Sequence, residues 1–195
     1  MRSDRETPAG RLAQWLEELE RFDLPDWDSL PELDLYMDQV ILLLTRYLAP
    51  IDRDSDERSI TASIINNYVR MKVIPPPLKK KYSRVHLAYL VIICTLKQSL
   101  SIACIQRLLP AGQGEEAARE LYTQFIRQYR RSVDFIRGIS VRGGRLALED
   151  SGELLMEGGG SLTLTTAILS TLSKSLTEFL LRPEGGAEDE DYDDE

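Results

Sequence analysis

Residues 60–84 read Ile-Thr-Ala-Ser-Ile-Ile-Asn-Asn-Tyr-Val-Arg-Met-Lys-Val-Ile-Pro-Pro-Pro-Leu-Lys-Lys-Lys-Tyr-Ser-Arg, and two apolar segments follow up to Leu109. Thr61 is a favourable N-cap, because its hydroxyl can accept a hydrogen bond from the first turn of a helix. Ile65, Tyr68 and Val69 recur at helical spacing, so this face is expected in a core. Three prolines at 75–77 are expected to stop the helix. The stretch therefore predicts a helix from Thr61 to about residue 71.

The other face of this predicted helix carries polar side chains. Ser63, Asn66, Asn67 and Arg70 recur at i, i+3, i+4 and i+7, and only Arg70 is charged. An asparagine amide matches the donor and acceptor of adenine in the major groove, and an arginine suits guanine or a phosphate. The pattern is typical of a DNA-reading face. The alternative is that the asparagines form a solvent-exposed helix surface that binds no partner.

The charge of the chain is unevenly distributed. The net charge is −8, but residues 58–114 contain nine Lys or Arg and no Asp or Glu. The remaining residues hold 15 basic and 32 acidic side chains. A basic module within an acidic chain predicts attraction to phosphate with limited non-specific binding. The alternative is a solvated basic surface without a partner.

The same stretch resembles the DNA-binding head of the mercury-resistance-regulator (MerR) family of winged helix-turn-helix proteins. It also resembles a bacterial family known as domain of unknown function 1836, over roughly residues 30–110. Two departures from the MerR pattern stand out: Asn66-Asn67 replace its usual Arg-Tyr pair, and its wing shrinks to residues 78–81. The residues that match the MerR family are Thr61, Ile65, Tyr68, Arg70, Val73-Ile74-Pro75-Pro76, Tyr82-Ser83, Ser101-Ile102 and Ile105. The residues that match the second family are Leu33 to Gln39, Ile65 to Val69, the three prolines at 75–77 and Lys79 to Ser83.

The MerR resemblance implies a helix-turn-helix that binds double-stranded DNA, in which Tyr68 packs with its hydroxyl free for a phosphate. The basic residues that follow the prolines are expected to hold backbone phosphates; they are Lys79, Lys80, Lys81 and Arg84. The candidate DNA-binding residues are Thr61, Ser63, Asn66, Asn67, Tyr68, Arg70, Lys79, Lys80, Lys81 and Arg84.

The rest of the chain is expected to be helical, which makes the protein all-α. A strongly apolar helix capped by Ser83 and running to about Gln98 should be the most buried. Residues 139–148 predict a small β-hairpin turning at Gly143-Gly144, with a loop as the alternative. The other expected helices are Leu12–Leu19, Leu33–Leu48, Ser101–Leu109, 115–137 and 162–181.

Four regions are expected. They are an N-terminal helix and linker at 1–32, the MerR-like module with its shortened wing at 33–112, C-terminal helices at 113–183, and an acidic, disordered tail at 184–195.

The helices at 115–137 and 162–181 carry long apolar stripes that include Phe125, Leu172 and Leu176. They suggest a homodimer, because a DNA-binding protein gains contacts when two copies pair with two-fold symmetry. The alternative is that these two helices bury each other in one chain.

The chain shows no recognisable catalytic or metal-binding motif. It has no phosphate-binding glycine loop, nucleophile elbow or zinc spacing. Cys94 and Cys104 are expected to be buried, reduced thiols. The acidic residues 52–57 lack the Gly and bidentate Glu of a calcium loop. His86 is the sole histidine, without carboxylates beside it in sequence. We therefore expect neither an enzyme nor a bound metal or cofactor.

No run of about 18 apolar residues and no signal-peptide pattern is present, so we expect a cytoplasmic protein that does not enter a membrane. The leading hypothesis is a DNA-binding transcription regulator. The alternative is a non-enzymatic helical module that binds other proteins and has lost DNA binding with its shortened wing.

Overall fold

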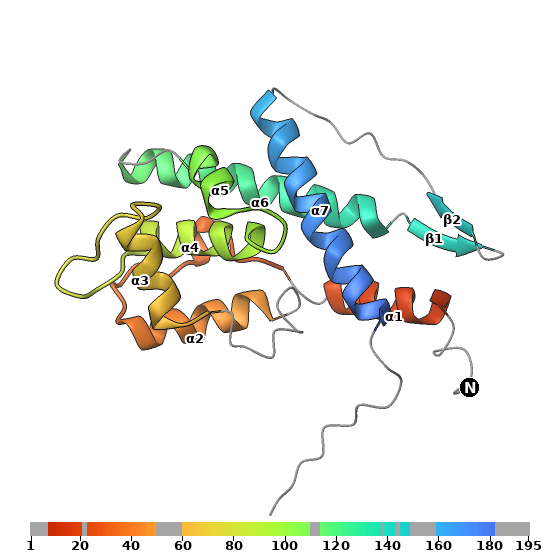
Figure 1. The fold of residues 1–195 in the computed structure, drawn as a ribbon, viewed down its shortest axis with the longest axis horizontal. Helices are drawn as coiled ribbons and strands as arrows, with labels where there is room; N and C mark the ends of the chain where they lie inside the picture. Colours follow the sequence, from red (N-terminus) through yellow and green to blue (C-terminus); the bar gives the residue numbers. More distant parts are fainter. Residues whose placement is uncertain are drawn as a thin grey trace, which may run out of the picture.

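Seven α-helices and one β-hairpin make up the part of the chain that the computed structural model describes, which is residues 8–20, 23–49, 60–109, 114–137, 139–142, 145–148 and 159–181 (Figure 1). The predicted all-α class is therefore confirmed, with a hairpin added. The elements are α1 Pro8–Glu20, the 3-10 helix η1 Trp27–Ser29, α2 Met37–Leu48, α3 Ala62–Arg70, α4 Arg84–Leu96, α5 Ile102–Leu108, α6 Glu115–Arg137, β1 Ile139–Arg142, β2 Arg145–Leu148 and α7 Gly159–Leu181.

Helix α4 is the centre of the core. Every residue from His86 to Leu96 is buried, because this helix is apolar nearly all round and is contacted by α2, α5, α6 and α7. The predicted position of the most buried helix is confirmed. Its N-cap is Ser83, as the sequence predicted.

The apolar stripes of α6 and α7 cover each other within one chain. The two helices pack together, and Phe125 of α6 and Leu172 of α7 are fully buried. The sequence had suggested these side chains for a dimer interface. Phe125 and Leu172 are thus covered within the single chain, and the homodimer through these helices stays a prediction.

Residues 23–28 are fixed across α6 by polar contacts. Arg130 donates to both carboxylate oxygens of Asp23 at 2.6–3.0 Å and to Asp26 at 2.9 Å. The Tyr122 hydroxyl donates to the carbonyl of Pro25 at 2.8 Å. The hydrogen bonds to the two carboxylates raise the pKa of Arg130 further above its ordinary value, so its charge is permanent. These contacts hold the segment that leads into η1 and place Trp27 on the core.

Two helix starts differ from the prediction. Helix α2 begins at Met37 rather than Leu33, because Leu35 instead pairs with Tyr82 in an isolated β-bridge. Leu33 is consequently 79% exposed and does not belong to the apolar stripe. Helix α7 begins at Gly159, three residues before the expected start.

The hairpin predicted at residues 139–148 is present. Strand β1 pairs antiparallel with β2, and Arg142 lies opposite Arg145, which leaves a two-residue connection. That connection, Gly143-Gly144, lies outside the described residues. The same holds for the predicted acidic tail at 184–195 and the acidic loop at 51–58.

A single cluster of buried side chains extends from α1 to α7. It includes Trp15 of α1, Val40 of α2, Ile65 of α3 and Ile168 of α7. Among the described residues, the buried side chains of α6 and α7 therefore belong to the same cluster as those of α2 to α5. None of the helices in the described ranges has the length and apolar character needed to cross a bilayer.

Candidate nucleic-acid interface

Helix α3 is short and closed at both ends by local hydrogen bonds. At the start, the Thr61 hydroxyl accepts from the N–H of Ile64 at 3.3 Å, as its N-cap position predicted. At the end, Lys72 adopts a left-handed backbone with φ 57°. The N–H of Lys72 then donates to the carbonyl of Val69, and the N–H of Val73 to that of Tyr68. This is a Schellman motif, which ends α3 at Arg70, well before the prolines that the sequence suggested as the stop.

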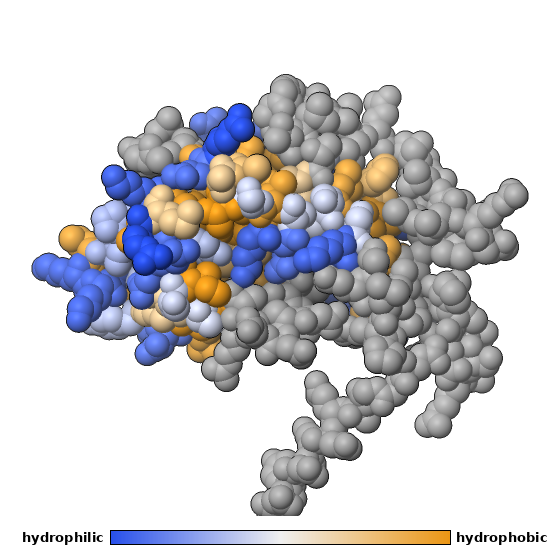
Figure 2. Space-filling model, in the orientation of Figure 1, coloured by the Kyte–Doolittle hydropathy of each residue, from blue (hydrophilic) through white to orange (hydrophobic). Residues whose placement is uncertain are grey.

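The two faces of α3 separate as the sequence predicted. Ile65 and Tyr68 are buried, whereas Ser63, Asn66 and Arg70 are exposed. A helix of this kind has one side fixed in the core and the other open to a partner. In Figure 1, α3 lies at one end of the molecule beside the 71–82 segment, and Figure 2 shows strongly hydrophilic side chains gathered at that end.

Asn67 does not share the open arrangement of Asn66. Its side-chain oxygen accepts from Nη2 of Arg70 at 2.7 Å, and its amide nitrogen lies 3.5 Å from the sulfur of Met71. Both polar groups of Asn67 therefore contact its own helix end. The two asparagines, which looked equivalent in the sequence, occupy different environments.

Residues 78–81, which the sequence predicts as a shortened wing, form a tight turn. The N–H of Lys81 donates to the carbonyl of Leu78 at 2.9 Å, and the two central residues, Lys79 and Lys80, have φ of 50° and 64°. Positive φ at both central positions is typical of a type I′ turn, in which lysine is unusual. Leu78, Lys79 and Lys80 are all exposed. Two ammonium groups and one leucine thus stand at the tip of a closed turn.

A short β-ladder attaches this turn to the segment before α2. Leu35 and Tyr82 exchange both backbone hydrogen bonds, at 2.9 and 2.8 Å. The ammonium of Lys81 lies 5.2 Å from the centre of the Tyr36 ring, within the range of a cation–π contact. Lys81 is therefore half-buried and faces a protein ring, while its two neighbours face solvent.

Arg84 does not take the phosphate-binding position predicted from the sequence. Its side chain is only 14% exposed, forms an ion pair with Glu32 at 3.2 Å, and lies 5.8 Å from the Trp27 ring centre. A guanidinium held between an aromatic face and a carboxylate stabilises the fold locally and is not presented to solvent. Arg84 is therefore removed from the predicted set of phosphate contacts.

Thr61 and Tyr68 also have structural roles. The Thr61 hydroxyl is used as the helix cap. Tyr68 is 4% exposed, and burial raises the pKa of its hydroxyl above the ordinary value. The packing predicted for Tyr68 is confirmed. The surface that remains open consists of Ser63, Asn66, Arg70, Lys79 and Lys80, with Asn67 behind Arg70.

His86 supports the junction between the turn and α4. The N–H of Ser83 donates to Nδ1 of His86 at 3.0 Å, and the Ser83 hydroxyl lies 2.8 Å from the same nitrogen. Because Nδ1 accepts, the proton of the neutral ring is on Nε2. Burial lowers the pKa of His86, while the carbonyls of Pro75 and Pro76 and the charge of Asp34 act in the opposite direction. His86 is thus a buried, neutral capping residue.

Lys72 is an exposed basic residue that the sequence patterns did not select. It follows Arg70 closely and lies between the polar face of α3 and the lysine turn. The sequence shows that Lys72 belongs to the stretch without acidic residues. Its position in the structure depends on the left-handed backbone conformation at the end of α3, which the sequence does not show. Glu32 and Asp34 precede the bridge residue Leu35, and Asp38 follows it in the first turn of α2.

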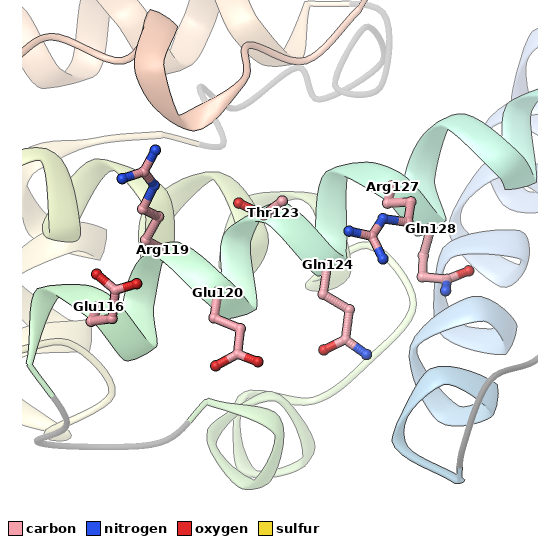
Figure 3. Close-up of a pocket in the computed structure, with 7 residues that line it drawn as sticks. All are labelled: Glu116, Arg119, Glu120, Thr123, Gln124, Arg127 and Gln128. Atoms are coloured by element: carbon pink, nitrogen blue, oxygen red, sulfur yellow. The ribbon is translucent and has the colours of Figure 1, made fainter.

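A polar pocket of about 450 Å³ lies along α6 (Figure 3). All of the described side chains around it come from this one helix, and acidic, basic and amide groups alternate along it. Ligand sites usually bring together polar groups from several elements over an apolar lining. The lining formed by the described residues comes from one helix and is polar. The pocket residues are Glu116, Arg119, Glu120, Thr123, Gln124, Arg127 and Gln128.

The described residues contain no group of three or more His, Cys, Asp or Glu side chains placed to hold a metal. Both cysteines are free thiols. Cys94 is buried as predicted, but Cys104 is exposed, because it lies on the solvent side of the short helix α5.

Comparison with known proteins places the chain in one family. The model of a family described as a domain of unknown function (DUF1836) matches residues 25–130, which is more than half of the chain, so the protein belongs to that family. The match covers η1, α2 to α5 and most of α6, and thus the whole surface described above. No curated protein and no solved structure matches this chain.

Proposed function

We propose that this protein is a DNA-binding transcription regulator, whose α2–α3 unit acts as a MerR-like helix-turn-helix with a shortened wing. In this proposal α3 enters the major groove of double-stranded DNA, and the turn at 78–81 lies on the adjoining phosphates. The observation that carries the proposal is the combination of one open polar helix face with a two-lysine turn. Both are within a stretch that contains no carboxylate.

The face of α3 has the chemistry needed to read bases. Asn66 and Arg70 are exposed and lie one helical turn apart, and Ser63 precedes them on the same side. The major groove admits an α-helix, and amide and guanidinium groups are its commonest purine readers. The opposite side of α3 is fixed by Ile65 and Tyr68, so the helix is held rigidly for docking.

The lysine turn supplies affinity that does not depend on sequence. Lys79 and Lys80 are exposed at the centre of the turn, and Lys72 adds a third charge between the turn and α3. Cations that neutralise phosphates release counterions, which makes binding sensitive to salt. Lys81 is half-buried against Tyr36 and contributes mainly by supporting the turn.

A protein-interaction module is the second candidate function, and one observation favours it. Leu33, Tyr36 and Leu78 are exposed to 79%, 56% and 73%, and all three belong to the two chain segments joined by the Leu35–Tyr82 bridge. Apolar side chains gathered on a surface are typical of protein contacts. In this case the lysine turn would border a protein interface and no DNA would bind.

Fluorescence anisotropy with the full chain and a random-sequence duplex library separates the two functions. We expect binding at low ionic strength that weakens steeply as salt is added, followed by enrichment of a subset of duplexes over rounds of selection. Absence of salt-sensitive binding to any duplex would reject the regulator. The interaction module would then be the function to test.

A further inference from the structure

We infer that Asn67 is a positioning residue for Arg70 and that Arg70 reads a guanine, so that the site recognises a guanine close to an adenine. This inference rests on the proposed DNA binding and deepens it. Its starting point is the 2.7 Å hydrogen bond from Nη2 of Arg70 to the side-chain oxygen of Asn67.

Asn67 is already fully engaged on its own helix. Its oxygen is taken by Arg70 and its amide nitrogen by the sulfur of Met71. Reading adenine requires both groups of one amide at once. The side chain of Asn66 is exposed, whereas both polar groups of Asn67 already make a contact. Asn66 is therefore the adenine reader, and Asn67 has a different role.

The contact leaves Arg70 competent to bind guanine. A guanidinium has five N–H donors in a planar fork, and one of them is used by Asn67. Two further donors are enough for the bidentate contact to O6 and N7 of guanine. Fixing the long side chain before DNA arrives reduces the rotamer entropy lost on binding. Asn67 thus acts on the base through Arg70.

Hydrogen bonds through Met71 connect Asn67 to a second helix, α5. Gln106 of α5 donates to the carbonyl of Met71 at 3.3 Å, and the N–H of Met71 donates to the carbonyl of Asn67 at 2.9 Å. The helix end that carries both Asn67 and Arg70 is therefore tied to α5. This tie keeps the geometry of the pair independent of the solvent-facing turn.

The spacing of the two readers limits the recognised element. Asn66 and Arg70 are four residues apart, which is about 6 Å along a helix. Successive base pairs are about 3.4 Å apart along the duplex. With α3 lying along the major groove, the adenine and the guanine fall within about two base-pair steps of each other.

A double-mutant cycle on the selected duplex tests the inference. We expect Arg70→Ala to weaken binding to that duplex about 5- to 150-fold, the range for one bidentate base contact. Asn67→Ala should weaken it about 2- to 12-fold, the range for ordering one long side chain. In the Arg70→Ala background, Asn67→Ala should have no further effect, because nothing remains to be positioned. For Arg70→Ala, which also removes a positive charge, the loss of affinity for random DNA should be smaller than the loss for the selected duplex.

Asn66→Ala is the matched control, since it removes an amide from the same helix but should cost the same in both backgrounds. A loss from Asn67→Ala that is equally large with and without Arg70 would overturn the positioning role. A selected duplex that tolerates replacement of every guanine would overturn the reading by Arg70. Both outcomes presuppose salt-sensitive binding by the wild-type chain, whose absence would instead reject the proposed function itself.

Discussion

Lys72 holds a backbone conformation that only glycine adopts without cost. Its φ of 57° is needed for the Schellman motif that ends α3 and turns the chain toward the prolines. A left-handed backbone costs a non-glycine residue about 1–2 kcal/mol of stability. Glycine avoids this strain, but part of the gain is lost because glycine has more conformational freedom in the unfolded chain.

We predict that Lys72→Gly increases the free energy of unfolding by about 0.5–1 kcal/mol, because the strain is relieved. Urea denaturation followed by circular dichroism measures the change. Lys72→Ala is the control, since it removes the same charge and keeps the Cβ atom, and it should leave the stability nearly unchanged. Equal stability of all three proteins would show that the turn at Lys72 is not strained.

His86 makes the stability depend on pH in a defined direction. Its folded pKa is below the ordinary value of 6.5, so the unfolded chain binds more protons as the pH falls through that value. The neutral ring stabilises the fold above about pH 6.5, and this contribution is lost on acidification. Protonation would also remove the acceptor that Nδ1 offers to the N–H of Ser83.

We predict that stability falls between about pH 7.5 and about pH 5, and that His86→Gln makes this fall smaller, because glutamine keeps an acceptor but does not titrate. Unfolding midpoints measured across that range test the prediction. Parallel curves for the two proteins would mean that other groups cause the acid sensitivity.

At the scale of elements, the sequence predicts helices well where the apolar pattern is long. Helix α4 is correctly predicted because His86 to Leu96 is almost uninterrupted in its apolar character. The start of α2 is wrong by four residues, since the backbone pairing of Leu35 with Tyr82 joins residues 47 positions apart and leaves no local signal. The periodicity of apolar residues predicts local helices, but it does not predict backbone pairing between residues far apart in the sequence.

The candidate site is predicted in outline and not in detail. The open face of α3 and the exposure of Lys79 and Lys80 follow from spacing alone. The inward turn of Arg84 could not be predicted, because it depends on Trp27 and Glu32, which lie 57 and 52 residues earlier in the sequence. The different roles of Asn66 and Asn67 depend on the rotamer of Arg70, for which the sequence has no pattern.

We predict that Leu90→Ala lowers the free energy of unfolding by about 2–5 kcal/mol, since Leu90 is fully buried in α4. Leu42→Ala is the matched control on α2, where the side chain is 55% exposed, and it should change stability by less than about 0.5 kcal/mol. Chemical denaturation of both variants makes the comparison. Similar effects of the two substitutions would contradict the central position of α4.

At the scale of the whole molecule, the core is shared by the N-terminal helix α1, the helices α2 to α5 and the C-terminal helices α6 and α7. Arg130 and Tyr122 fix the 23–28 segment on α6, and α6 packs on α4. The surface that carries α3 is therefore built on the entire fold. Variants on α6 and α7 are expected to affect DNA binding only by destabilising the protein.

We predict that the unbound protein sediments as a single species of 22.2 kDa at micromolar concentration. The reason is that Phe125 and Leu172, two of the side chains that suggested a dimer, are already buried within one chain, in which α6 and α7 pack together. Sedimentation velocity tests this. A species of about twice that mass would place an association surface elsewhere, and the exposed Leu33 and Leu78 would be the first residues to replace.

The measurement that tests the central claim most directly is the salt dependence of DNA binding for two charge-matched variants. One variant carries Lys79→Ala and Lys80→Ala in the turn, and the other carries Arg127→Ala and Arg131→Ala on α6. If the turn lies on phosphates, the first variant lowers the slope of log affinity against log salt by about 1.8, which is about 0.9 for each lost contact, and the second leaves the slope unchanged. Equal slopes for the two variants would contradict the assignment of α3 and its turn as the DNA-binding surface.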